Sequence, residues 1–242
     1  MYKAIMIMDP DHSPIQPFLV ETPVDALGPI VRENILIDNR TFVIARPGQS
    51  DHLMDDPVVQ SAFRADEYLP YWTELWPAAR MLAKIILRET WISGLEVLEV
   101  GCGLGLAGIA ALIKGHRVIF SDYDATALRF AAFNARLNGF DNFQQLQMDW
   151  RFPPPGLKVP VLLMADLIYE LRNINPLVAL IKKVLLPGGV CFLTDPPRLP
   201  TYNLREALDG EGMPYTTQTM KTGEPGRRHK GIIYRINLPP RT

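Results

Sequence analysis

From Leu95 onward, the sequence alternates short apolar or β-branched runs with longer segments whose apolar residues recur at helical spacing. The runs that predict strands are 97–100, 117–121, 143–148, 159–164 and 190–194. The segments that predict helices are 104–114, 125–137, 176–185 and, more briefly, 203–208. This alternation constrains the fold most, because strand–helix–strand units build an α/β, mostly parallel sheet with helices on both faces. A final pair of runs, 215–220 and 231–237, lacks an intervening helix, so the last of seven strands is expected to be antiparallel.

Residues 1–70 do not follow this alternation. The stretch up to Pro29 is rich in proline and weakly periodic, which predicts an irregular arm. Two β-branched runs, 30–37 and 41–46, predict a hairpin, and 55–65 has the spacing of a short helix. We therefore expect residues 1–70 to form an extension and not an independent domain, and residues 71–242 to form the main domain.

Charge and cysteine usage exclude several classes of protein. Lys and Arg total 25 against 26 Asp and Glu, whereas proteins that bind nucleic acid or anionic membranes through their whole surface carry a basic surplus. The two cysteines, Cys102 and Cys191, cannot build a disulfide framework, which predicts a reduced, cytoplasmic protein. The four histidines show no metal-ligand spacing, and no run approaches the roughly 18 apolar residues of a membrane span. We expect a monomer without a metal.

A glycine-rich loop, Glu99–Gly105, stands where the first strand of the main domain passes into a helix. Glycine allows a close approach of backbone to a ligand, and the first helical turn offers unpaired N–H groups. Gly103, Gly105 and Gly108 fit the G-x-G-x-x-G spacing of dinucleotide-binding folds, with Asp122 near the expected acidic position. A tight turn without any ligand is the other interpretation.

Acidic residues at three strand ends favour a different cofactor. Glu99 could hold an ammonium group, Asp122 could accept hydrogen bonds from ribose hydroxyls, and Asp149-Trp150 could bind the amino group and ring face of an adenine. Ligands of open α/β sheets bind at these carboxyl ends. One site for an amino acid, a ribose and an adenine describes S-adenosylmethionine (SAM), which becomes S-adenosylhomocysteine after methyl transfer. Asp122 alone could equally cap the following helix.

At these residues the sequence resembles the class I, seven-strand SAM-dependent methyltransferases, which have a Rossmann-like sheet, with Glu99–Gly105 as motif I. Tyr71–Ala79 resembles the W-P-x-A entry helix of the protein-lysine methyltransferase group (methyltransferase family 16), and Ala165–Glu170 resembles its D-x-x-Y motif. That group modifies proteins such as chaperones, elongation factors, calmodulin and the electron-transfer flavoprotein β-subunit, and some relatives act on arginine or histidine. The cofactor contacts predicted from the strand ends and this resemblance are Trp76, Glu99, Gly101, Cys102, Gly103, Gly105, Asp122, Tyr123, Asp149, Trp150 and Ala165.

The resemblance also implies an acceptor side. Asp166 and Tyr169 are expected to face the methyl-accepting nitrogen as catalytic residues, with Tyr71, Trp72 and Glu74 on the substrate side. A lysine must lose its proton before it attacks a sulfonium methyl, and an aromatic, water-poor slot lowers its pKa while a carboxylate captures the cation. The alternative for the tryptophans of this segment is that they anchor an amphipathic helix in the core.

Two further segments carry weaker signals. Asp195–Arg198 resembles the [DN]-P-P-[YF] motif of other amino-methylating enzymes, but it follows the fifth expected strand and not the fourth, which favours a rigid substrate-side loop. The basic cluster Arg227–Lys230 is expected to be a solvated turn before the last strand.

The sequence therefore predicts a SAM-dependent methyltransferase that acts on a protein side-chain nitrogen, with lysine favoured. A small-molecule amine or hydroxyl remains an alternative acceptor. A dinucleotide-dependent oxidoreductase and a catalytically inactive SAM-binding module are the alternatives from other classes.

Overall fold

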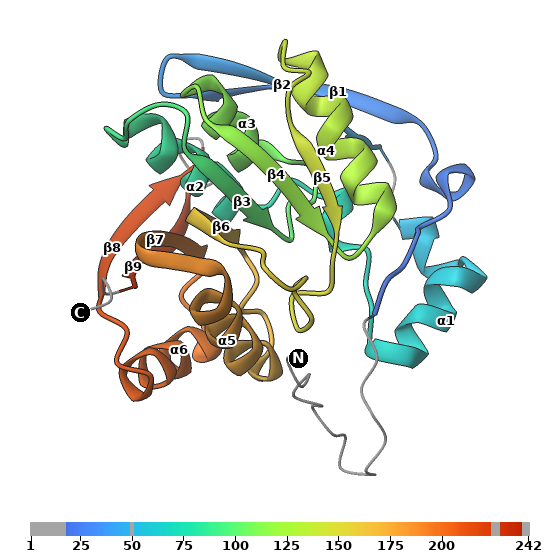
Figure 1. Ribbon diagram of the computed structural model, residues 1–242. Helices are drawn as coiled ribbons and strands as arrows, with labels where there is room; N and C mark the ends of the chain where they lie inside the picture. The colour runs from blue at the N-terminus through green and yellow to red at the C-terminus, as the bar shows by residue number, and fades with distance from the viewer. Residues whose placement is uncertain (1–17, 49–50, 224–227, 239–242) are drawn as a thin grey trace.

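The computed structural model describes residues 18–48, 51–223 and 228–238, and a seven-stranded sheet forms its centre (Figure 1). The sheet consists of β3 (Glu96–Val100), β4 (Arg117–Asp122), β5 (Gln144–Gln147), β6 (Val159–Ala165), β7 (Leu185–Asp195), β8 (Tyr215–Thr222) and β9 (His229–Asn237), in the order β5-β4-β3-β6-β7-β9-β8. The pairs from β5 to β7 are parallel, and β9 is antiparallel to both β7 and β8. The predicted fold class and the antiparallel last strand are confirmed.

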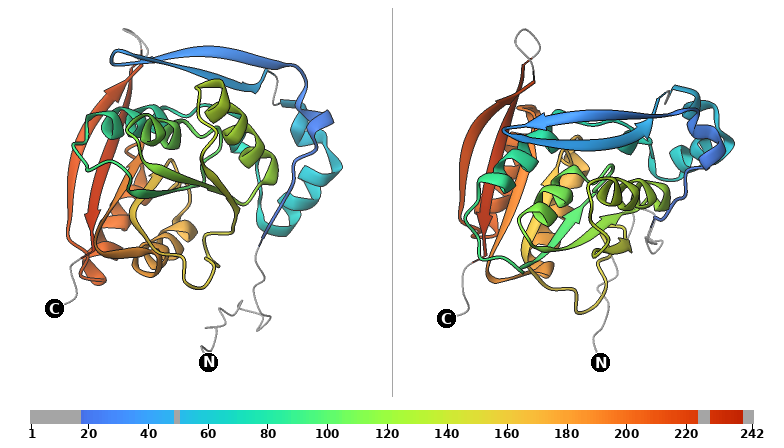
Figure 2. Two further views of the ribbon diagram at one scale, coloured as in Figure 1. Left: turned by 45° about the horizontal axis from the view of Figure 1, so that its top comes forward. Right: turned by 90° about the horizontal axis from the view of Figure 1, so that it is seen from above.

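Helices cover both faces of this sheet (Figures 1 and 2). The helices are α1 (Pro57–Asp66), α2 (Pro77–Arg88), α3 (Leu106–Ile113), α4 (Ala125–Leu137), α5 (Ile174–Val184) and α6 (Leu199–Gly210). Val97 of β3 belongs to the core cluster that contains α2, α3 and α4, whereas its neighbour Leu98 belongs to the cluster that contains α5 and α6. Because successive strand residues point to opposite faces, the apolar run of β3 supplies two cores at once.

The predicted hairpin forms a separate two-stranded sheet of β1 (Ile30–Ile37) and β2 (Arg40–Pro47), which lies across the outer side of α4 and α2 (Figure 2). Alternate hairpin side chains, including Phe42 and Ile44, enter the same core as the helices beneath it. The Asn134 amide of α4 bonds both the N–H and the C=O of Ala45, at 2.7 and 3.0 Å.

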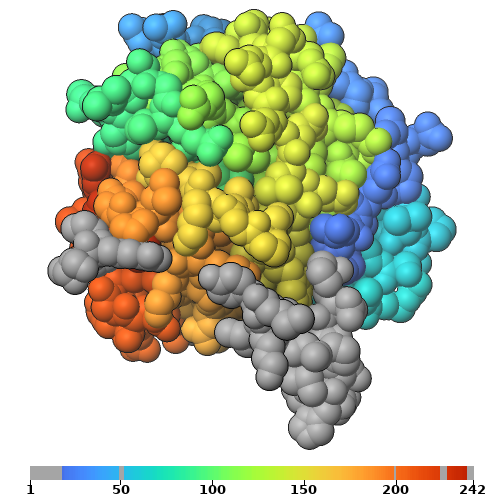
Figure 3. Space-filling model, in the orientation of Figure 1, coloured from blue at the N-terminus to red at the C-terminus, as the bar shows by residue number. Residues whose placement is uncertain are grey.

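The described N-terminal segment runs beside the turn that follows β4. Val20 N–H donates to Tyr123 O at 3.0 Å, and Val20 O accepts from Ala125 N at 2.9 Å. Val20 also packs in a cluster with Tyr68 and with α1, and Figure 3 shows this blue segment against the cyan α1. Nothing in the sequence pattern predicted this contact between distant segments.

Several boundaries differ from the expectation. β7 begins at Leu185 and not at 190, because Leu185 pairs with Val159 across a register irregularity, and Gly188 and Gly189 lie within the strand. α6 is longer than predicted and begins directly after Arg198. The arm before Phe18 and Arg227 of the basic cluster lie outside the described residues.

Within the described ranges, no helix is long and apolar enough to cross a membrane, and no group of three His, Cys, Asp or Glu could hold a metal ion.

The buried side chain of His116, the residue before β4, leads us to expect that this residue lowers stability in acid. Its side chain is 4% exposed, packs on Trp91 at a ring separation of 5.5 Å, and finds no hydrogen-bond partner for either nitrogen among the described residues. Burial, with a contribution from Lys114, lowers the pKa of His116, so the folded state favours the neutral ring. The contribution of His116 to the free energy of unfolding is therefore expected to have its full value above the unfolded-state pKa of about 6.5 and to fall as the pH drops below it.

Urea unfolding at pH 8, 6 and 5 measures this dependence. His116→Phe keeps a ring of similar size against Trp91. Between pH 8 and pH 5 the variant should lose less of its free energy of unfolding than the natural chain. Equal pH slopes in the two proteins would contradict the assignment.

Candidate functional site

The glycine loop after β3 adopts backbone conformations that side chains rarely allow. Gly101, Gly103 and Gly105 have φ values of 59°, 50° and 80°, and Gly105 forms the N-cap of α3. The loop is tied to the neighbouring strand by a 2.9 Å hydrogen bond from Cys102 N to Ser121 O. Glycine is therefore required here for the left-handed backbone, and the loop exposes its main chain toward the sheet edge.

Glu99 lies at the end of β3 and turns toward α3. Its Oε2 accepts from Gly108 N at 2.8 Å, and its side chain is nearly fully buried. Burial outweighs these backbone hydrogen bonds and raises the pKa of Glu99 to about 8. One carboxylate oxygen is thus committed to the start of the helix, and the Glu99 side chain also lines the cavity at the ends of the strands.

Gly108 is the third glycine of the G-x-G-x-x-G spacing, and close packing explains why glycine is needed there. A Cβ at this position would lie 2.6 Å from Glu99 Oε2 and closer still to the Phe120 ring. We expect Gly108→Ala to lower the free energy of unfolding by about 1–3 kcal/mol, as overpacking does. In urea unfolding, Gly210→Ala is the matched control, because a Cβ at Gly210 meets nothing within 4 Å. Equal losses in both variants would contradict this packing role.

Asp122 ends β4 beside the glycine loop. Its Oδ2 accepts from Gly103 N at 3.0 Å and its Oδ1 from Asp124 N at 3.1 Å. Burial raises the pKa of Asp122 to about 7 against the effect of these hydrogen bonds. The residue that caps α4 is Asp124 and not Asp122, because the Asp124 side chain accepts from Thr126 N at 2.7 Å. Asp122 therefore links the loop to the following turn and remains on the cavity wall.

One cavity of about 80 Å³ collects nearly all the predicted site residues at the carboxyl ends of the strands. Its wall includes Tyr71, Trp72, Glu74, Trp76, Glu99, Gly101, Cys102, Gly103, Gly105, Asp122, Tyr123, Trp150, Ala165, Asp166 and Tyr169. Burial raises the pKa of the Cys102 thiol well above its usual range, so this residue is a small neutral side chain and not a nucleophile. Residues from segments far apart in the sequence thus meet at one site.

Asp149 is the predicted contact that lies elsewhere. It lines a neighbouring cavity of about 150 Å³, which shares Tyr71, Tyr123, Trp150 and Tyr169 with the first. The Asp149 carboxylate accepts from Phe18 N and Arg151 Nε, each at 2.9 Å. Both oxygens of Asp149 thus already accept hydrogen bonds within the chain, from Phe18 and from Arg151 two positions along.

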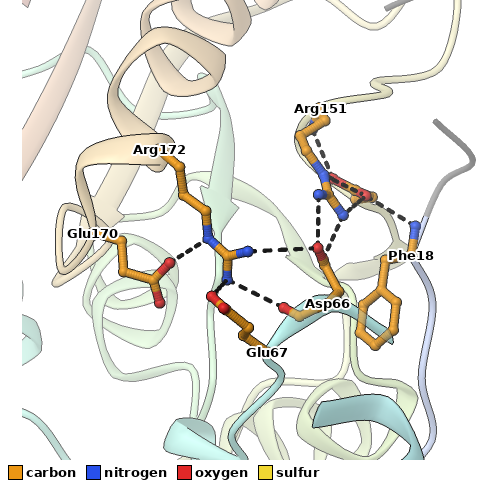
Figure 4. Close-up of polar contacts among 7 residues, drawn as sticks. Phe18, Asp66, Glu67, Arg151, Glu170 and Arg172 are labelled. Atoms are coloured by element: carbon orange, nitrogen blue, oxygen red, sulfur yellow. Dashed lines mark hydrogen bonds and ion pairs between the residues drawn. The ribbon is translucent and has the colours of Figure 1, made fainter. Parts of the chain in front are cut away.

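Arg151 continues into an ion cluster that joins three distant segments (Figure 4). Arg151 Nη2 lies 2.6 Å from Asp66 Oδ2 at the end of α1. Arg172 donates to Asp66 O at 3.2 Å and pairs with Glu67 at 3.1 Å and with Glu170. The cluster holds the segment after α1 against the loops that follow β5 and β6.

The acceptor-side residues follow β6 and the segment before α2. Asp166 has a φ of 59°, which is uncommon for a residue with a side chain. The Tyr71 ring stands edge-on to Tyr169 at 5.5 Å and to Trp76 at 5.9 Å. Burial raises the pKa of Tyr169 to about 12, which keeps its hydroxyl protonated. Asp166 thus lies beside a group of aromatic rings.

Trp72 and Glu74 line the cavity and also make contacts away from it. The Trp72 indole is 7% exposed, packs on Phe130 at 5.2 Å and donates to Tyr68 OH at 3.3 Å, so the core-anchor alternative describes it. Glu74 approaches Arg46 of the hairpin at 3.6 Å. The corresponding anchor role does not fit Trp76, which is 38% exposed.

Arg198 is a site residue that the sequence reasoning missed. Its guanidinium contacts Asp166 and lies 2.7 Å from Asp195. The sequence placed Arg198 only within a rigid substrate-side loop, and the positions of Asp166 and Asp195 directly after two expected strands were the signal that could have found its role. Phe18 and Tyr68, on the wall of the second cavity, had no comparable signal in the sequence.

Comparisons with known proteins agree with this geometry. A family model described as lysine methyltransferase matches residues 71–198, just over half of the chain. The chain is 32% identical over 127 residues to the histidine protein methyltransferase 1 homolog of Dictyostelium discoideum, covering 50% of this chain and 41% of that protein. It is 28% identical over 175 residues to the electron transfer flavoprotein beta subunit lysine methyltransferase of Xenopus laevis, covering 64% and 70%. The chain thus spans about two fifths of the Dictyostelium protein's length.

Among solved structures, the chain resembles the N-methyltransferase NodS from Bradyrhizobium japonicum WM9 in complex with S-adenosyl-L-homocysteine. The TM-score is 0.57 at 16% identity, over 76% of this chain and all of that one (100%). At this identity the likeness concerns the fold.

Proposed function

The chain belongs to the lysine methyltransferase family, and from this we propose that it is a SAM-dependent methyltransferase whose acceptor is a lysine side chain of a protein. The observation that carries the proposal is the single cavity that joins the glycine loop and Asp122 to Asp166 and Tyr169. A cofactor side and an acceptor side in one cavity suit direct transfer between two bound molecules.

The residues present fit SAM. We assign its amino-acid part to the glycine loop, whose positive-φ backbone faces the cavity, and its ribose to the carboxylate of Asp122. The adenine is assigned to Tyr123 and Trp150, whose rings stand edge-on at 6.2 Å. When bound, SAM supplies a methyl group on a positively charged sulfur.

The acceptor side is suited to a lysine nitrogen. Asp166 can accept a hydrogen bond from the entering ammonium group, while the rings of Tyr71, Trp76 and Tyr169 limit the water around it. Exclusion of water disfavours the charged form of lysine and so promotes loss of the proton before transfer. The chain's own contribution is to bind, orient and desolvate the nitrogen.

Two measurements test the proposal. Calorimetry should detect binding of SAM and S-adenosylhomocysteine, and absence of binding at high micromolar ligand would reject the cofactor. A cell lysate incubated with tritiated SAM and the protein should then label a protein band, which mass spectrometry can map to a lysine. Label confined to RNA or small molecules would reject a protein acceptor. A labelled histidine would instead match the activity in the name of the Dictyostelium relative.

Two broader proposals accompany this function. Residues 1–70 act as an extension of the main domain, which is supported by the entry of hairpin side chains into the common core. The protein works in a reducing compartment such as the cytoplasm, which is supported by Cys102 and Cys191 both being free and buried.

A further inference from the structure

Two carboxylates emerge together at the acceptor side of the sheet. Ala165 of β6 is in register with Thr194 of β7, so the residues that follow them, Asp166 and Asp195, leave neighbouring strands at the same edge. Asp166 N also donates to Thr194 O at 2.9 Å. Two carboxylates in one buried cluster cannot both remain ionised at low cost unless a cation joins them.

Arg198 is that cation. Its Nη2 contacts Asp166 Oδ1 and lies 2.7 Å from Asp195 Oδ1. The short connection from β7 begins with Pro196, whose ring restricts the backbone, and the carbonyl of Pro196 accepts from Thr201 Oγ1 at 3.0 Å. The loop therefore delivers the guanidinium to a defined place between the two strand ends.

The two carboxylates differ in how many further hydrogen bonds they can accept. Asp195 is fully buried, and its Oδ2 accepts from Ile168 N at 3.0 Å. The Asp166 side chain is 11% exposed and lines the cavity, and no described residue hydrogen-bonds its Oδ2. With both acids ionised, the three side chains carry one net negative charge, which a single further cation would balance.

We propose that Arg198 is a positioning residue of the acceptor subsite: by bridging Asp166 and Asp195 it fixes Asp166 Oδ1 and leaves Oδ2 to receive one lysine ammonium group. This role rests on the proposed function. Without the guanidinium, the two carboxylates face each other, one of them takes up a proton, and Asp166 is free to turn away from the acceptor.

The charges around the pair are consistent with this role. Burial raises the pKa of Asp195 to about 7 and also raises that of Asp166, while Arg198 opposes the shift at both. Tyr234 of β9 is a further titratable group near Asp195, and Arg205 of α6 donates to its hydroxyl at 3.1 Å. Loss of Arg198 therefore removes the cation that opposes protonation of the pair.

Carboxyl titration by NMR tests the bridge without any substrate. The protein is labelled with ¹³C at the aspartate carboxyls, and Asp166→Asn and Asp195→Asn assign the two signals. In Arg198→Met, at least one of these carboxyls should titrate about 1–3 pH units higher than in the natural chain. Arg198→Lys restores the charge and should bring the titration most of the way back. Arg64→Met, at an exposed position of α1 outside this network, is the control and should leave both curves unchanged.

The same variants are then compared in methyl transfer from tritiated SAM to the dominant labelled protein band of a lysate. Arg198→Met should lower the rate and move the acid limb of its pH profile upward, with Arg198→Lys between it and the natural chain and SAM affinity unchanged. Identical carboxyl titrations in the natural chain and Arg198→Met would overturn the inference. Failure of the natural chain to label any protein would contradict the proposed function, while the NMR titration would still decide whether Arg198 controls the pair.

Discussion

Asp122→Ala is expected to weaken SAM binding by about 10- to 100-fold, since a hydrogen bond to a charged group contributes about 1.5–3 kcal/mol. The carboxylate is assigned to the ribose hydroxyls, and it also holds Gly103 N at 3.0 Å. Its loss therefore removes a contact to the ligand and, at the same time, the hydrogen bond that holds the glycine loop. Isothermal titration calorimetry measures the affinity, and circular dichroism checks that the fold is retained.

The pH dependence provides a second readout for Asp122. Because burial raises the pKa of this carboxyl to about 7, lowering the pH through this value protonates the group, removes its negative charge and turns one of its two acceptor oxygens into a donor. SAM affinity of the natural chain should therefore fall as the pH drops below about 7, and Asp122→Asn should lack this decline. Asp209→Ala, at an exposed position of α6, is the control. Undiminished affinity in Asp122→Ala would contradict the ribose assignment.

Asp166→Ala is expected to suppress turnover by about 100- to 10,000-fold, the range typical for a positioned acid–base group, with little change in SAM affinity. Asp166 lies on the same cavity wall as Asp122, but its carboxylate accepts from Arg198 and not from the glycine loop. Two assays should therefore distinguish the two aspartates: Asp122→Ala should affect cofactor binding, and Asp166→Ala should affect methyl transfer to protein.

Radiolabel transfer from tritiated SAM at saturating cofactor measures the turnover of this variant. Asp166→Asn should be nearly as slow, because it keeps the shape and removes the charge. Asp141→Ala, an exposed residue between α4 and β5, is the control. Equal and negligible effects of Asp122→Ala and Asp166→Ala would show that the site has been assigned to the wrong place.

Local sequence patterns predicted most of the fold, because the helices and strands of the main domain begin and end at residues whose preferences depend on their neighbours in the sequence. Pro77 opens α2 after the non-helical Trp76, Asp124 caps α4 and Gly105 begins α3, as the capping and turn preferences of these residue types imply. The main boundary errors arose at β7 and α6. There the strand pairing of Leu185 and the tertiary contacts of the loop after Asp195 extend elements beyond their local signal.

The candidate site was predictable where a residue's position at a strand end was sufficient. Asp122, Trp150 and Asp166 reach the cavity because β4, β5 and β6 are parallel and end at the same edge of the sheet, with β3 between β4 and β6. Side-chain direction was not predictable for Trp72, which turns into the core against Phe130, or for Asp149, whose carboxylate accepts from Phe18 N. Both outcomes depend on a partner that only the folded chain brings near.

The alternating strand and helix segments from Leu95 onward, with the glycine loop at their start, determined by themselves the parallel sheet and the edge where a ligand would bind. Backbone preferences and side-chain period are local, so they can be read from the chain. The tertiary structure alone decided which charges surround that edge. It joined Arg198 to Asp166, and through Arg151 and Asp66 it fastened α1 beside the loop after β5. These pairs link residues far apart in the sequence, and their contacts exist only after the strands have found their register.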